Sequence, residues 1–162
     1  MDTMRVGVFE ETDRPALCRM LAESEDFPQH LLYLHRRAGS HHTTLVARRG
    51  EQIDGMLGGS FDADLAVTGV FDVFELPPAP HAFLDRIHVR EAARGRGVGR
   101  ALIEAFAFEA MERECTFIGG SIDLSPGLTA RKVFFEGLGF SIREHGNIGA
   151  DPTGVLAAIM NS

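Results

Sequence analysis

Three glycines stand where a strand-like run gives way to a helix-like run, in the stretch Arg94-Gly95-Arg96-Gly97-Val98-Gly99-Arg100. Glycine leaves backbone N–H groups uncovered, and the start of a helix carries a partial positive charge, so this stretch suits a phosphate. Between residues 90 and 100 there are four arginines and one acid, whereas the whole chain carries a net charge of −7. The sequence therefore predicts a pocket for a polyanionic cofactor at this glycine loop.

Two common phosphate-binding motifs do not fit the loop. A P-loop requires G-x-x-x-x-G-K-[ST], and no Lys-Ser or Lys-Thr pair follows these glycines. A dinucleotide fingerprint requires G-x-G-x-x-G, but the sixth position counted from Gly95 is Arg100. A purely structural turn, in which glycine only supplies a positive φ, would leave the arginines unexplained.

The elements around the loop predict an α/β fold in which one mixed sheet carries helices on both faces. The expected order is β-α-α-β-β-β-α-β-α-β-β. Strands are predicted at 5–9, 43–49, 52–61, 83–89, 116–124, 140–144 and 154–160, and helices at 13–21, 28–38, 98–112 and 126–137. Residues 62–81, called the 62–81 excursion below, interrupt this pattern and are expected to leave the sheet, with a short strand of their own.

Composition narrows the class of protein. The chain has 162 residues, of which 44% are hydrophobic and 24% charged, and this predicts a single domain spanning 1–162. No apolar run approaches the roughly 20 residues that cross a bilayer, and the acidic balance argues against a nucleic-acid partner. Two cysteines without metal-ligand spacing favour the cytoplasm. The seven histidines form no metal motif, so no metal is expected and surface positions are favoured.

The spacing of the loop resembles the GNAT superfamily of N-acetyltransferases. The pattern Q/R-x-x-G-x-G/A of that family is similar to residues 94–99 here. The run Leu84-Asp85-Arg86-Ile87-His88-Val89 resembles the strand that precedes the family's loop, and Phe134-Phe135-Glu136-Gly137-Leu138-Gly139-Phe140 resembles its F-Y-E-K-x-G-F segment. The order of elements also matches, so the resemblance covers nearly the whole chain.

The resemblance implies acetyl-CoA as the acyl donor. It places the pyrophosphate on the backbone of residues 95–100, flanked by Arg94, and the pantetheine arm along the preceding strand at Ile87, His88 and Val89. A small-molecule or peptide amine would be the acceptor, and a homodimer is compatible with exposed closing strands. The resemblance does not identify the acceptor.

Acyl transfer to an amine requires a group that takes a proton from the acceptor's ammonium. Asp85 is the first candidate and His88 the alternative. Because they are three residues apart in a strand, they are expected on opposite faces of the sheet. Asp72 and Glu75 in the 62–81 excursion are candidates for holding the amine.

One position departs from the family pattern. The tyrosine that usually protonates the departing thiolate corresponds to Phe135, and the only tyrosine in the chain is Tyr33. Two alternatives to an acetyltransferase therefore stay open. The first is a module that binds acyl-CoA without turning it over, and the second is a nucleotide- or phosphosugar-binding enzyme with a similar loop.

Overall fold

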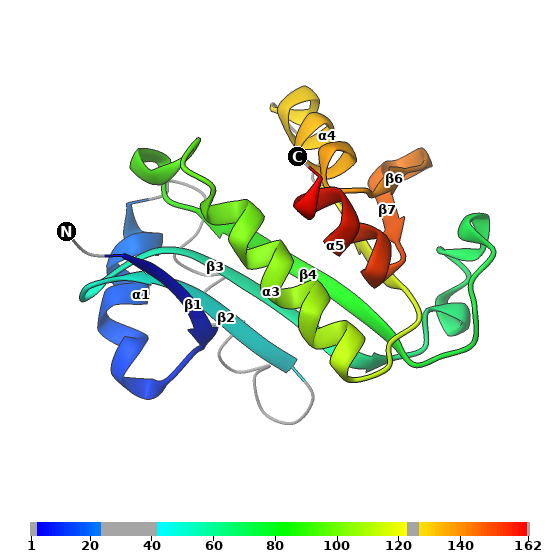
Figure 1. The fold of residues 1–162 in the computed structure, drawn as a ribbon, viewed down its shortest axis with the longest axis horizontal. Helices are drawn as coiled ribbons and strands as arrows, with labels where there is room; N and C mark the ends of the chain where they lie inside the picture. Colours follow the sequence, from blue (N-terminus) through cyan, green and yellow to red (C-terminus); the bar gives the residue numbers. More distant parts are fainter. Residues whose placement is uncertain (1–2, 24–41, 123–126, 162) are drawn as a thin grey trace. The chain divides into compact units, whose positions relative to one another are not determined.

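The computed structural model describes residues 3–23, 42–122 and 127–161. Its helices and strands are shown in Figure 1. They are β1 (Met4–Val8), α1 (Arg14–Ala22), β2 (His42–Arg49), β3 (Gln52–Ala63), β4 (His81–Val89), α3 (Val98–Glu112), β5 (Ile118–Ser121), α4 (Leu128–Gly137), β6 (Ser141–Ile142), β7 (Asn147–Ala150) and α5 (Pro152–Met160). Within these ranges, no helix combines the length and the apolar character needed to cross a membrane.

The seven strands form a mixed sheet in the order β1-β2-β3-β4-β5-β7-β6. Strands β4 and β5 pair in parallel, whereas β1 pairs with β2, β5 with β7 and β6 with β7 in antiparallel fashion. The parallel pair is the one that α3 connects, as a crossover requires. This arrangement confirms the predicted α/β fold with a mixed sheet.

Contacts along the chain divide it into two compact units, the first of which comprises Met1–Gly59 and Arg86–Ala105. Here β3 is covered on both faces. A Cβ built on Gly55 would lie 2.9 Å from Val98 and 3.0 Å from Leu102, so the start of α3 packs directly on β3. Met56 packs with Leu17 of α1 instead. Because adjacent strand residues point to opposite faces, α1 and α3 cover opposite sides of this strand.

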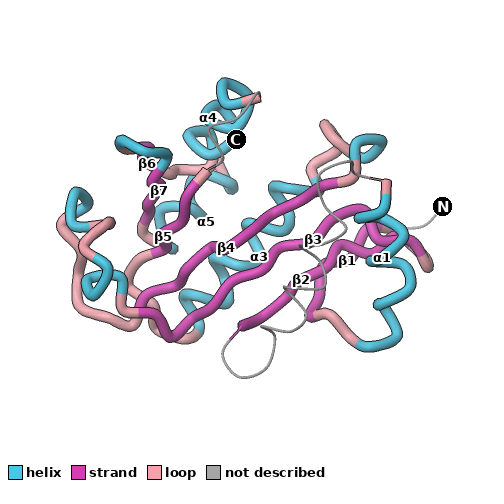
Figure 2. Tube along the Cα trace, turned by 180° about the vertical axis from the view of Figure 1, so that it is seen from behind, coloured by secondary structure: helices cyan, strands magenta, loops and turns pink. Residues whose placement is uncertain are grey.

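The second unit comprises Ser60–Asp85 and Phe106–Ser162. Figure 2 shows β5, β7 and β6 side by side in it. One of its hydrophobic clusters joins the 62–81 excursion to β4 and to the residue before β5, through Leu65, Phe71, Phe83 and Phe117. Glycine makes room for this cluster, because a Cβ on Gly119 would lie 2.5 Å from Leu65 and 3.1 Å from Phe71.

Three local predictions are wrong. Residues 154–160 form helix α5, whose N-cap Asp151 accepts a hydrogen bond from the Thr153 N–H at 2.9 Å. A short apolar run does not distinguish a buried helix from a strand, and the Asp-Pro start decides it here. The preceding strand is β7 instead, and the predicted strand 140–144 shortens to β6. The 62–81 excursion contains two 3-10 helices, Leu65–Thr68 and Asp72–Phe74, and no strand between β3 and β4.

Two further predictions fall outside the described residues. The helix expected at 28–38 is one of them. The other is the helix start expected at Ser125-Pro126, although α4 itself is described from Leu128 onward.

Candidate functional site

The glycine loop connects β4 to α3 as the sequence predicted. After Val89 the chain makes one 3-10 turn, Glu91–Ala93, and α3 begins at Val98. The first helical hydrogen bond runs from the Ala101 N–H to the Gly97 carbonyl at 3.0 Å. The amides of Val98, Gly99 and Arg100 therefore occupy the first turn, where N–H groups have no partner within the helix. These amides are the donors that an anion would meet.

Gly95 and Gly97 are required by the backbone. Their φ angles are +78° and +83°, a region that residues with a Cβ rarely adopt. A Cβ built on either glycine would have no heavy atom within 4 Å. The space beside both is open, so a diphosphate can approach the backbone without displacing a side chain. The buried side chain of Val98 fixes the helix start next to this opening.

The positive charge of the loop is smaller than the sequence indicated, because Arg90 is committed elsewhere. Its guanidinium donates to Glu23 at 2.8 Å and 2.9 Å and lies 3.6 Å from Asp54. The other charged residues between 90 and 100 are Arg94, Arg96, Arg100 and Glu91. Arg94 and Arg96 are exposed, whereas Arg100 is half-buried. The Arg94 Nε also donates to the Val89 carbonyl at 3.2 Å, which ties this side chain to the end of β4.

Asp54 hydrogen-bonds the residue at the start of the loop, Arg90. Its side chain is 3% exposed and accepts hydrogen bonds from Gln52 at 2.6 Å and Arg49 at 3.0 Å, while its carbonyl accepts from the Arg90 N–H at 2.9 Å. Burial raises the pKa of the Asp54 carboxyl, but these hydrogen bonds and the charges of Arg49 and Arg90 outweigh it and hold the pKa below its ordinary value. Asp54 is therefore ionised at neutral pH. No pattern in the sequence predicted this cluster.

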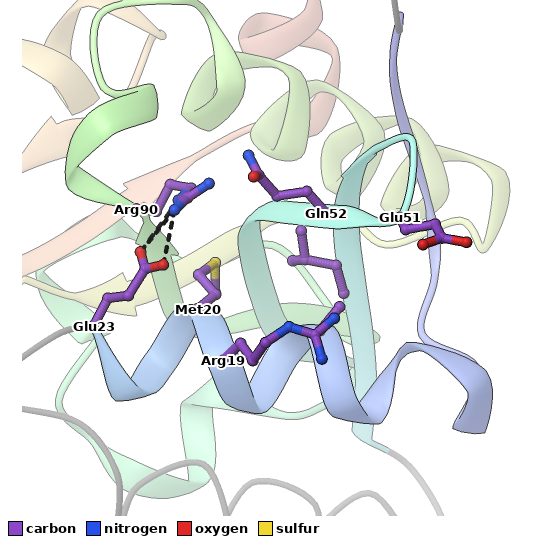
Figure 3. A pocket seen from close by; sticks show the side chains of 8 residues that line it. Arg19, Met20, Glu23, Glu51, Gln52 and Arg90 are labelled. Atoms are coloured by element: carbon purple, nitrogen blue, oxygen red, sulfur yellow. Dashed lines mark hydrogen bonds and ion pairs between the residues drawn. The ribbon is translucent and has the colours of Figure 1, made fainter.

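A cavity of about 260 Å³ opens beside the Arg90–Glu23 ion pair, between α1 and the start of β3 (Figure 3). Its floor contains Met20, and its charged lining consists of Arg19, Glu23, Glu51 and Arg90. Two positive and two negative side chains balance, so this cavity offers no excess of positive charge for a diphosphate.

The second half of β4 has one edge that β5 does not cover. In the described residues the register with β5 runs from Ala82 to Leu84, whereas β4 continues to Val89. Because the Arg90 N–H points toward β3 and backbone groups alternate along a strand, those of Ile87 and Val89 point toward the opposite edge. These backbone groups are therefore open to a hydrogen-bonding partner on that edge.

Asp85 and His88 lie on opposite faces of β4, as predicted for residues three apart. Phe83 packs edge-on against Phe71 of the 62–81 excursion, with ring centroids 6.4 Å apart. Asp85, two residues later, shares the face of Phe83. Both Asp85 and His88 are half-buried. Burial, with the positive charges of Arg94 and Arg86, lowers the pKa of His88, so its imidazole is neutral at pH 7.

Asp72 and Glu75 stand at the two ends of one 3-10 turn in the 62–81 excursion. The Glu75 N–H donates to the Asp72 carbonyl at 3.1 Å, and both residues are exposed. Asp72 directly follows Phe71, the residue that contacts Phe83. The structure thus brings Asp72 and Glu75 together, on an element that packs against the Asp85 face of β4.

Phe135 and His81 are both buried. Phe135 is 5% exposed and packs edge-on against Phe134 and Phe140, with centroid distances of 5.0 Å and 5.5 Å. His81 is 1% exposed, whereas surface positions were expected for the histidines. In the described part of the chain, no three His, Cys, Asp or Glu residues are grouped to hold a metal ion.

Comparisons with known proteins agree with the fold. The model of the Acetyltransferase (GNAT) family matches residues 10–140. The search of curated proteins finds no match.

Similar solved structures share the fold at low identity. The ribosomal-protein-S18-alanine N-acetyltransferase of Escherichia coli is 17% identical with a TM-score of 0.69, covering 92% of this chain and 94% of its own. An aminoglycoside 6'-N-acetyltransferase of Acinetobacter haemolyticus is 22% identical with a TM-score of 0.64, covering 86% and 92%. The PaiA N-acetyltransferase of Thermoplasma acidophilum, in complex with coenzyme A, is 10% identical with a TM-score of 0.65, covering 92% and 99%.

Proposed function

This chain belongs to the acetyltransferase (GNAT) family, and we propose on that premise that it is an N-acetyltransferase that moves an acetyl group from acetyl-CoA to an amine. The observation that carries the proposal is the open, glycine-lined start of α3, where Gly95 and Gly97 adopt positive φ and a built Cβ would meet nothing within 4 Å. Acetyl-CoA would supply an activated thioester and a diphosphate by which it is held. The coenzyme A in the PaiA structure supports this choice of donor.

The residues of the loop bind and orient the donor. The amides of residues 98–100 and the positive end of α3 would hold the diphosphate, with Arg94, Arg96 and Arg100 adding positive charge. The backbone groups of Ile87 and Val89 on the uncovered edge of β4 would hydrogen-bond the pantetheine arm. A strand amide near the acyl carbonyl would stabilise the negative charge that develops there.

Asp85 is the proposed base. It shares the face of β4 that packs against the 62–81 excursion, where Asp72 and Glu75 would hold a cationic amine. The carboxylate of Asp85, acting through water, would take a proton from the acceptor's ammonium, so that the neutral amine can attack the acyl carbon. The bond from nitrogen to the acyl carbon forms and the bond from that carbon to sulfur breaks. The thiolate leaves, and the second proton lost by the nitrogen passes through water to the thiolate, giving the free thiol. His88 lies on the opposite face of β4 and is the weaker candidate.

The test measures binding and turnover separately. Calorimetry with coenzyme A reports binding, and release of free thiol from acetyl-CoA reports turnover with spermidine, phenethylamine and alanine amide. We expect Asp85→Asn to reduce turnover at least tenfold while the Kd for coenzyme A stays within twofold, since the proposed role of Asp85 is proton transfer from the acceptor and not donor binding. Asp151→Asn is the matched control, because Asn caps a helix about as well as Asp. An undiminished rate in Asp85→Asn would remove Asp85 from the mechanism.

A module that binds acyl-CoA without turnover is the second candidate, and Phe135 is the observation that favours it. A phenylalanine cannot donate a proton to the departing thiolate. The same two assays decide between the candidates, because a binding module would bind coenzyme A with no thiol release above the uncatalysed rate for any amine. Competition between coenzyme A and ATP for one site would favour the nucleotide-binding alternative instead.

The remaining expectations are proposals of the same kind. We propose that residues 1–162 act as a single acyltransferase domain in the cytoplasm, where the free thiols of Cys18 and Cys115 would persist. We also propose a homodimer, which analytical ultracentrifugation tests. Its interface cannot include a strand at 154–160, because those residues lie in helix α5.

A further inference from the structure

Among the residues that the structure describes, His81 is the most buried ionisable side chain that the proposed reaction does not use. It is the first residue of β4 and is 1% exposed. Its Nδ1 accepts a hydrogen bond from the Leu65 N–H at 2.9 Å, and its Nε2 lies 2.8 Å from the Pro77 carbonyl oxygen. A carbonyl only accepts and a backbone N–H only donates, so both contacts are satisfied by one form of the ring. That form is the neutral imidazole with the proton on Nε2.

The two partners of His81 lie near the two ends of the 62–81 excursion. Leu65 begins the first 3-10 helix, and Pro77 follows the second by three residues. The ring thus closes the segment 65–77 into a loop that does not depend on the residues at its tip. Phe117 packs edge-on against the ring, at a centroid distance of 6.3 Å. The hydrogen bond to Leu65 is buried and the one to Pro77 is partly buried.

The C-terminal end of the 62–81 excursion is also held beside the residues that precede β5, by contacts that do not involve His81. The Thr116 N–H donates to the Pro80 carbonyl at 3.0 Å, and the Thr116 hydroxyl donates to the Pro78 carbonyl at 2.7 Å. Leu65 and Phe71 are each 4% exposed and pack over Gly119. A surface loop free to move would not bury its side chains in this way.

We propose that His81 is a positioning residue for the amine acceptor: through its two hydrogen bonds it holds the segment 65–77, and with it Asp72 and Glu75, against the face of β4 that carries Asp85. The inference rests on the proposed function. It predicts that loss of the His81 hydrogen bonds weakens acceptor recognition and leaves the donor site unchanged, because residues 86–105 make none of these contacts.

Three variants divide the two hydrogen bonds. His81→Phe keeps an aromatic ring but removes both. His81→Asn keeps an acceptor near the Nδ1 position, and His81→Gln keeps a donor near the Nε2 position. His145→Asn is the matched control, because His145 is exposed and its φ of +63° is one that asparagine tolerates. Thermal unfolding establishes whether each variant folds. If His81→Phe does not fold, His81→Asn and His81→Gln are used for the test instead.

The kinetic readout is the KM for whichever panel amine the wild type acetylates fastest, set against the Kd for coenzyme A. For His81→Phe we expect the acceptor KM to rise roughly tenfold or more, as loss of a buried hydrogen bond implies, and the Kd for coenzyme A to stay within twofold. The single-bond variants should fall between wild type and His81→Phe. An unchanged acceptor KM in folded His81→Phe would overturn the proposal.

NMR separates failure of this inference from failure of the proposed function. The nitrogen shifts of His81 should report the Nε2–H form, and the Leu65 amide should exchange at least tenfold faster in His81→Phe than in wild type. An Nδ1–H or doubly protonated ring at pH 7 would overturn the assignment of the two His81 hydrogen bonds. A wild type that binds no coenzyme A would overturn the proposed function and the acceptor role with it, whatever the NMR result.

Discussion

The replacement of Gly97 by alanine is the sharpest test of the donor site. Gly97 has a φ of +83°, and a residue with a Cβ in the left-handed region costs about 1–2 kcal/mol. A Cβ there would meet nothing within 4 Å, so no clash inside the protein adds to this cost. The expected effect is therefore one of backbone conformation, together with the loss of open space beside the loop.

The strain can appear in either of two measurements. If the loop keeps its conformation, stability falls by about 1–2 kcal/mol, which lowers the Tm by about 2–8 °C in a chain of this size. If the free loop relaxes, the same energy opposes binding, and the Kd for coenzyme A rises about 5- to 30-fold. Calorimetry and thermal unfolding on one sample distinguish the two cases, and the two effects together should account for the strain.

Two variants serve as controls. Gly137→Ala makes the same change at the end of α4, where the backbone needs no positive φ and a Cβ again meets nothing within 4 Å. It should stabilise the protein by about 0.5–1 kcal/mol and leave coenzyme A binding unchanged. Gly97→Asn adds more bulk but tolerates the left-handed region, so better binding than by Gly97→Ala would identify conformation as the cause. A Gly97→Ala protein with wild-type Tm and wild-type Kd would refute the reasoning.

Three other changes have outcomes that the structure fixes. Asp54→Asn leaves Arg49 and Arg90 without their buried carboxylate, so we expect the free energy of unfolding, measured with urea at pH 7, to fall by about 3 kcal/mol. The folded pKa of Asp54 lies below the unfolded value of 3.8. The ionic contribution of Asp54 to stability is therefore complete above pH 3.8 and is lost as the pH falls through the folded pKa. His88 also has a lowered folded pKa, so the wild type should lose stability as the pH falls from 6.5 toward that pKa. In His88→Asn the free energy of unfolding should depend less on pH over this range. The same pH dependence in both proteins would contradict the lowered pKa of His88. Phe135→Tyr places a hydroxyl among buried rings at a cost of about 1–3 kcal/mol, so the Tm should fall by several degrees while thiol release stays unchanged, and a large loss of turnover would show that the phenylalanine shapes the site.

The sequence by itself determined the elements whose signals are local. The strand before Arg90 and the helix after Gly97 were predictable, because glycine, charge and hydrophobic periodicity act over a few residues. The opposite faces of Asp85 and His88 followed from the alternation of a strand alone. The last helix was missed for a local reason too, since an apolar run of this length fits either element until its Asp151 cap is recognised.

Only the tertiary structure decided which charges are available and which segments are held. Arg90 looked like part of the cationic loop, but Glu23 and Asp54, far apart in sequence, neutralise it. The sequence predicted a surface position for His81, but the fold buries it against Leu65, whose N–H donates to its ring from sixteen residues away. Partners of this kind are chosen by packing between distant segments. A buried ion pair, or a side chain that hydrogen-bonds two distant segments, therefore cannot be predicted from the neighbouring residues. The conformation of a glycine loop can be, because glycine itself permits the positive φ.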